Sequence, residues 1–237
     1  MGIPENIERV RERIRAAVRR AGRNADEVAL MAVTKTFPPG SIRQAYEAGM
    51  TLFGENRVQE FAGKAEALRD LHDAAWHMIG HLQTNKAAKA AELFSGVDSV
   101  DSLRLAQKLN SSAKEVNKNL GVLVEINVGG EVAKSGIAPE SSDLEELLRS
   151  AGELEHLEIR GLMTVPPFTE DPQQARRFFR KLRTLREEIA CRGLPRIGMD
   201  VLSMGMSHDF EVAIEEGSTC VRVGTAIFGE RTKGMQK

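Results

Sequence analysis

Short apolar runs alternate with amphipathic stretches along almost the whole chain, and this alternation constrains the fold more than any other feature. The first run, VALMAV at residues 28–33, is continuously apolar, which is typical of a parallel strand covered on both faces. Eight runs are predicted strands, over residues 28–33, 52–56, 75–81, 96–102, 121–128, 157–165, 200–205 and 220–229.

The segments between these runs carry apolar residues at helical spacing. Predicted helices cover residues 38–49, 58–71, 85–94, 103–110, 139–153, 173–190 and 208–217. Strands separated by helices of this length imply right-handed crossovers and a parallel sheet. The eight strand–helix units predict an α/β protein, a (β/α)8 TIM barrel that spans residues 1–237 as one domain.

One extra helix is predicted before the first strand, because Ile3, Ile7, Val10 and Ile14 recur at steps of three or four. It would either plug the floor of the barrel or pack outside it. An open, doubly wound sheet is the alternative architecture. Its dinucleotide-binding form places GxGxxG after the first strand, whereas this chain has TKTFPPG at residues 34–40, which favours the barrel.

The charge balance argues against nucleic acid or an anionic membrane as a partner, because 33 basic residues face 34 acidic ones. The two cysteines, Cys191 and Cys220, lie in no disulfide or metal-ligand spacing, so we expect a reduced, cytoplasmic protein. There is no apolar run of about 18 residues to cross a membrane, and the charged N-terminus does not look like a secretory signal.

Function in such a barrel gathers at the carboxyl ends of the strands, where Lys35 follows the first, wholly apolar strand. Partial desolvation lowers the pKa of an amine, and a neutral lysine attacks aldehydes to form a Schiff base. A solvated lysine that begins a loop is the alternative interpretation.

The loops after the seventh and eighth strands read SMGMSHD and RVGTAIFG, a pattern that favours phosphate binding in barrels. Ser207 and Thr225 offer hydroxyl donors, and Gly224 lets the backbone approach an anion. Arg222 shares a strand face with Gly224 and could approach a pyridine nitrogen; a salt bridge to Asp200 or Asp209 is the alternative. A lysine opposite a phosphate site predicts pyridoxal 5′-phosphate (PLP).

On these residues the chain resembles, nearly end to end, the pyridoxal phosphate homeostasis proteins, also called the YggS or PROSC family. The matching segments are AVTKT around Lys35, FGENRVQE at 53–60, WHMIGHLQTNK at 76–86, SVDS at 99–102, KSGI at 134–137, IRGLMT at 159–164, LSMGMSHDFEVAIEEGST at 202–219 and VRVGTAIFGER at 221–231.

The resemblance implies the fold of the N-terminal barrel of alanine racemase, with PLP held as a covalent aldimine on Lys35. The cofactor-binding residues that it implies or that the pattern suggests are Lys35, Asn56, His81, Met163, Ser207, Arg222, Gly224 and Thr225. The implied function is buffering or delivery of PLP without established catalysis, by a monomer whose partners are PLP and PLP-dependent apo-enzymes.

Two other hypotheses stay open. A PLP-dependent racemase or decarboxylase would need a second acid/base group, and in the racemases that resemble this chain it is a tyrosine from a further domain. Here the one tyrosine, Tyr46, is expected outside the barrel, and no room for such a domain is expected after the last strand. His81 and His208 are the other candidates for the second acid/base group. A barrel enzyme acting on another phosphorylated substrate would leave the placement of Lys35 unexplained.

Overall fold

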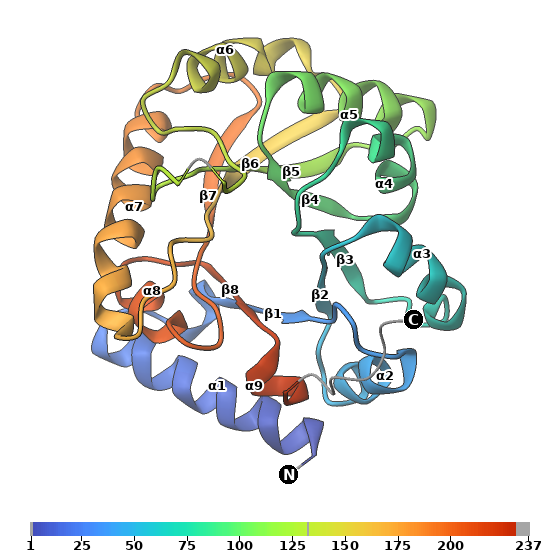
Figure 1. The fold of residues 1–237 in the computed structure, drawn as a ribbon, viewed down its shortest axis with the longest axis vertical. Helices are drawn as coiled ribbons and strands as arrows, with labels where there is room; N and C mark the ends of the chain where they lie inside the picture. The colour runs from blue at the N-terminus through green and yellow to red at the C-terminus, as the bar shows by residue number, and fades with distance from the viewer. Residues whose placement is uncertain (1, 132, 231–237) are drawn as a thin grey trace.

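The computed structural model describes residues 2–131 and 133–230, and these residues form a closed barrel of eight parallel strands (Figure 1). The strands are β1 (Ala29–Val33), β2 (Leu52–Glu55), β3 (Ala75–Met78), β4 (Gly96–Val100), β5 (Leu120–Glu125), β6 (Leu157–Met163), β7 (Ile197–Ser203) and β8 (Cys220–Val223). Each strand pairs with the next in sequence, and β8 pairs with β1 to close the ring. The predicted (β/α)8 barrel is confirmed.

Helices form the outer layer of the barrel (Figure 1). They are α1 (Ile3–Arg20), α2 (Pro39–Glu47), α3 (Val58–Ala65), α4 (Ala87–Leu93), α5 (Leu103–Glu115), α6 (Ser142–Ser150), α7 (Arg176–Ala190), α8 (Phe210–Glu215) and α9 (Thr225–Phe228). Among the described residues, no helix is both long and apolar enough to cross a membrane.

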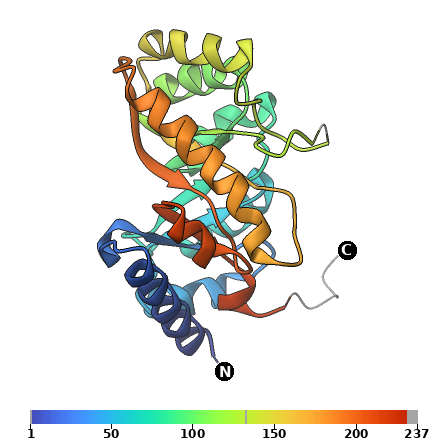
Figure 2. The same ribbon diagram turned by 90° about the vertical axis from the view of Figure 1, so that its left-hand side faces the viewer.

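Helix α1 packs outside the barrel, which settles the two placements that the sequence left open. It buries its apolar stripe against α8, α9 and α2, and Figures 1 and 2 show it running along the outer surface beside α9. The helix therefore covers the place where the last strand–helix unit meets the first.

Burial of aromatic side chains between the sheet and its helices supplies much of the outer core. Phe53 of β2 stacks on Trp76 of β3 with ring centroids 4.8 Å apart. Phe61 of α3 contacts both Trp76 and Phe94 with centroids 4.6 and 5.0 Å away. Large buried aromatic rings contribute strongly to core stability, so this cluster fixes α3 and α4 against β2 and β3.

The predicted strand ends differ from the structure, and the largest difference is at β8. The predicted strand 220–229 is wrong in its second half, because β8 ends at Val223 and residues Thr225–Phe228 form α9. Gly224 leaves the extended conformation there, and the Phe228 ring stacks on Phe37 with centroids 4.7 Å apart. Strand β7 begins at Ile197 rather than at Asp200.

The basic stretch at 176–186 lies on α7, with Phe179 and Leu182 on the buried face of the helix. Arginines on its exposed face form ion pairs. Arg176 and Arg180 pair with Glu216 just after α8, at 2.8 and 3.2 Å, and so join two neighbouring helices. Arg231, the last residue of the 221–231 motif, lies outside the described residues.

Candidate functional site

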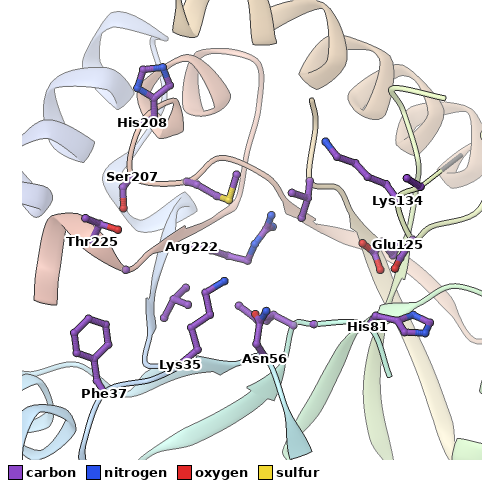
Figure 3. A pocket seen from close by; sticks show the side chains of 18 residues that line it. Lys35, Phe37, Asn56, His81, Glu125, Lys134, Ser207, His208, Arg222 and Thr225 are labelled. Carbon is purple, nitrogen blue, oxygen red and sulfur yellow. The ribbon is translucent and has the colours of Figure 1, made fainter. Parts of the chain in front are cut away.

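A cavity of about 540 Å³ opens at the carboxyl end of the barrel (Figure 3). This volume lies within the range of about 300–1,000 Å³ that is usual for small-molecule sites. Its lining comes from the carboxyl ends of the strands and from the segments that follow β1, β2, β3, β5, β6, β7 and β8. It includes Lys35, Asn56, His81, Glu125, Ser207, Arg222, Gly224 and Thr225. The structure thus brings together seven of the eight predicted cofactor residues, and adds Glu125.

Lys35 stands in the turn between β1 and α2, and its half-buried side chain points towards the middle of the cavity (Figure 3). The next residue, Thr36, has φ +68°, a left-handed conformation that is unusual for a β-branched residue. Such conformations persist only where the surroundings enforce them, and they concentrate at functional sites. The backbone beside Lys35 is therefore held in a shape that its own sequence does not favour.

Lys64 on α3 supplies the contacts that hold this turn. Its Nζ lies 3.2 Å from the carbonyl oxygen of Thr34 and 3.4 Å from that of Phe37, the two ends of the turn. The same ammonium lies 2.9 Å from carboxylate oxygens of both Glu55 and Glu60.

The carboxylates of this group have partners on the turn as well. The Thr34 hydroxyl donates to Glu55, and the backbone N–H of Thr36 donates to Glu60. Glu55 is fully buried, and burial raises its pKa, while the nearby Lys64 ammonium opposes that rise. We call Thr34, Glu55, Glu60 and Lys64 the turn cluster. Its members could not be recognised from the sequence, since Lys64 occupies an ordinary position in an amphipathic helix.

Ser207 and Thr225 lie side by side at one end of the cavity (Figure 3). The Ser207 hydroxyl accepts a hydrogen bond of 3.3 Å from the backbone N–H of Ala226, which ties the loop after β7 to the start of α9. Gly205, in the same loop after β7, allows close packing against α8. Its φ is +95°, and a Cβ there would lie 2.6 Å from the Cβ of Ala213 on α8.

Arg222 is almost fully buried, at 3% exposure, and lies between the two ends of the cavity (Figure 3). It donates to the Ser203 hydroxyl at 2.7 Å and to the Thr164 carbonyl oxygen at 2.8 Å. Within the described part of the chain, no ion pair joins it to Asp200 or Asp209, so that alternative is wrong. Two neutral acceptors fix its orientation and leave its charge directed at the cavity.

The other end of the cavity carries Asn56, His81, Glu125 and Lys134 (Figure 3). His81 Nδ1 lies 2.9 Å from an Asp101 carboxylate oxygen. Glu125, at 8% exposure, is a polar residue on an otherwise apolar strand. Burial, followed by the charge of Asp101, raises the Glu125 pKa to about 7, against the opposing effects of Arg222 and His81.

Glu125 is absent from the predicted cofactor residues. Two residues later, Asn127 donates its side-chain amide to the carbonyl oxygen of Glu131 at 2.9 Å. The signal was present in the sequence, since one carboxylate in the run GVLVEINV is unusual for a buried strand.

Met163 is the predicted cofactor residue that does not line the cavity. It ends β6 and is fully buried, and its register partner on β5 is Glu125. It therefore lies beside the polar end of the cavity rather than on its wall. His77, on β3, does not line the cavity either, and its Nδ1 lies 2.8 Å from the buried carboxylate of Asp98.

Comparison with known proteins assigns the family. The family model described as "Alanine racemase, N-terminal domain" matches residues 6–232. A pyridoxal phosphate homeostasis protein of Aquifex aeolicus is 48% identical, and the match covers 98% of this chain and 99% of that protein. The chain belongs to the pyridoxal phosphate homeostasis protein family.

Solved structures agree with this assignment. PipY of Synechococcus elongatus PCC7942, solved with PLP bound, is 36% identical with a TM-score of 0.83, over 96% of this chain and 100% of PipY. Alanine racemase of Corynebacterium glutamicum is 19% identical with a TM-score of 0.67, over 96% of this chain and 63% of the racemase, and at that identity supports the fold alone.

Proposed function

We propose that this protein binds PLP in the cavity and holds it for buffering or delivery. Lys35 would bind the aldehyde covalently, Ser207, Gly224 and Thr225 would hold the phosphate, and Arg222 would face the ring nitrogen. The observation that carries the proposal is that a lysine amine, a pair of hydroxyls and a buried guanidinium converge on one cavity of suitable size. The PLP-bound structure of PipY, a relative over the whole chain, supports it.

The residues present fit this group. When bound, PLP supplies an electrophilic aldehyde and an electron-withdrawing ring. Lys35 would hold the group through its amine, at the aldehyde. The Arg222 guanidinium stays protonated and can only donate hydrogen bonds, so it keeps the ring nitrogen unprotonated. An unprotonated ring withdraws electrons weakly, which suits storage better than carbanion chemistry.

The remaining predicted residues have lesser roles in this proposal. Asn56 and His81 line the cavity beyond the ring, and Met163 packs beneath that end. Gly80 permits this arrangement, because a Cβ there would lie 2.4 Å from the Asn56 carbonyl oxygen.

Delivery to PLP-dependent apo-enzymes in the cytoplasm is the second part of the proposal. The mouth of the cavity is lined by the exposed side chains of Val165 and Met206. Phe168, at 79% exposure, lies on the same side, with its ring 5.5 Å from that of His208. Exposed apolar groups at a site entrance are suited to transient contact with another protein.

The test is an absorbance spectrum of the purified protein with and without added PLP, followed by borohydride reduction and peptide mapping. We expect a yellow species in the wild type that reduction fixes on the peptide containing Lys35, and that Lys35→Ala abolishes. Lys89→Ala, on the surface of α4, is the matched control and should keep the band. A colourless wild type, or a band unchanged in Lys35→Ala, would contradict covalent binding at Lys35.

A further inference from the structure

The proposed function leaves the Glu125 carboxyl group without a role. It ends β5, whose register with β6 pairs it with Met163, and its own carbonyl oxygen accepts a hydrogen bond of 2.8 Å from Ile137 N–H. The backbone is thus held from both sides, and the side chain faces the cavity at the end away from Ser207 and Thr225 (Figure 3).

Glu125 Oε2 is buried and has no hydrogen-bond partner among the described residues. A buried polar atom without a partner is costly, and native proteins keep few of them. Because Glu125 also lines the cavity, a ligand bound there is placed to meet its carboxyl group.

The charged groups around Glu125 favour its neutral form. Burial and Asp101, which lies after β4 and repels a second negative charge, outweigh the opposing effects of Arg222 and His81. His81, after β3, pairs with Asp101, and Arg222 of β8 donates to Ser203 and Thr164.

The other charged side chain at this end of the cavity is also engaged. Lys134 Nζ lies 3.2 Å from both the Pro166 carbonyl oxygen and a Glu131 carboxylate oxygen. The cavity therefore holds a carboxyl group whose pKa burial and Asp101 raise to about 7, so that its protonated, hydrogen-bond-donating form is well populated at neutral pH.

We infer that Glu125 is a further cofactor-binding residue, which holds the anionic cofactor in its protonated form and repels it when ionised. The inference rests on the proposed function, because it takes the ligand of the cavity to be a pyridoxal phosphate. Its consequence is that the affinity for the cofactor decreases as Glu125 loses its proton.

The experiment measures binding of pyridoxine 5′-phosphate, which carries an alcohol in place of the aldehyde. Lys35 cannot form a Schiff base with it, so only non-covalent binding is measured. Dissociation constants from about pH 6 to about pH 8.5 are compared for the wild type and Glu125→Gln, which stays neutral throughout. Ionisation of the ligand phosphate affects both proteins equally and cancels in their ratio. Glu140→Gln, an exposed residue on the loop before α6, makes the same formal change and is the control.

We expect the wild type and Glu125→Gln to bind alike near the acidic limit, and the wild type to bind roughly ten-fold more weakly than Glu125→Gln near the alkaline limit. Glu140→Gln should follow the wild type. Equal pH dependence in the wild type and Glu125→Gln overturns the inference and leaves the proposed function standing. Absence of binding in all proteins overturns the proposed function itself.

A second measurement covers the case in which Glu125→Gln does not fold. Infrared difference spectra of the wild type, with and without pyridoxine 5′-phosphate near neutral pH, should contain the carbonyl band of a protonated carboxylic acid that shifts on binding. Glu125→Asp, which keeps a carboxyl group but shortens it, should move that band. A difference spectrum without such a band overturns the inference.

Discussion

At the scale of single residues, the buried Glu125 carboxyl group lowers the free energy of unfolding of the cofactor-free protein as the pH rises. Its pKa is raised from 4.5 to about 7, so the folded protein keeps a proton that the unfolded chain releases. A raised carboxyl pKa therefore removes stability as the pH rises from 4.5 to about 7, and the loss is complete above that range. At about 1.4 kcal/mol for each pH unit, the loss amounts to about 3 kcal/mol.

Glu125→Gln should therefore stabilise the protein without cofactor by about 3 kcal/mol near pH 8, with a gain that shrinks towards pH 4.5. Urea unfolding at several pH values measures it, and Glu140→Gln should show no such trend. A constant difference between wild type and Glu125→Gln across this range would mean that Glu125 titrates normally.

The sequence was enough to single out Lys35, whereas Glu125 was overlooked although its carboxylate stands out in an apolar run. Lys35 follows a wholly apolar strand at its carboxyl end, where barrel sites occur in general. Placing Glu125 at the cavity required knowing where β5 stops, and the ends of elements are the least predictable part of a pattern. The partners of Arg222 were equally inaccessible, because Ser203 and the Thr164 carbonyl belong to distant strands.

At the scale of elements, α3 and the turn after β1 form one unit through Lys64. Lys64→Met removes the cation and leaves the carboxylate of Glu55 buried without compensation, which typically costs about 3–5 kcal/mol. We expect a loss of this size in urea unfolding and a weaker yellow species at equal PLP, because the Lys35 turn loses its anchor.

Glu55→Gln combined with Lys64→Met should recover part of the stability, since it removes the uncompensated charge. Lys89→Met, which breaks an exposed pair with Glu92 on α4, is the matched control and should change unfolding little. If Lys64→Met behaved like Lys89→Met, the turn cluster would contribute nothing measurable.

Helix α9 could not be predicted from the local pattern of apolar residues. Residues 220–229 read as one apolar strand, yet the chain turns at Gly224 so that Phe228 reaches Phe37 and Asn6 of α1 donates to the Ile227 carbonyl oxygen at 2.8 Å. These contacts join residues near opposite ends of the described chain, and no local periodicity encodes them. Alternation and length, by contrast, were enough to predict the barrel.

At the scale of the whole molecule, we predict a monomer. The large hydrophobic side chains that are exposed among the described residues are Val116, Val165, Phe168 and Met206. A stable dimer interface usually buries about 800 Å² on each partner, more than so few groups provide. Sedimentation velocity at micromolar concentration should give one species of monomer mass. A dimer that Phe168→Ser dissociates would instead make the cavity mouth an interface.

The pairing of β1 with β8 has a consequence for synthesis in the cell. Lys35 leaves the ribosome early, whereas Arg222 and Thr225 emerge near the end of translation, and the ring closes only after they do. Under the proposed function, a nascent chain carries Lys35 long before it has a place for the phosphate. Binding of the cofactor would then require translation of the barrel to be finished, and fragments left by premature termination would not bind it.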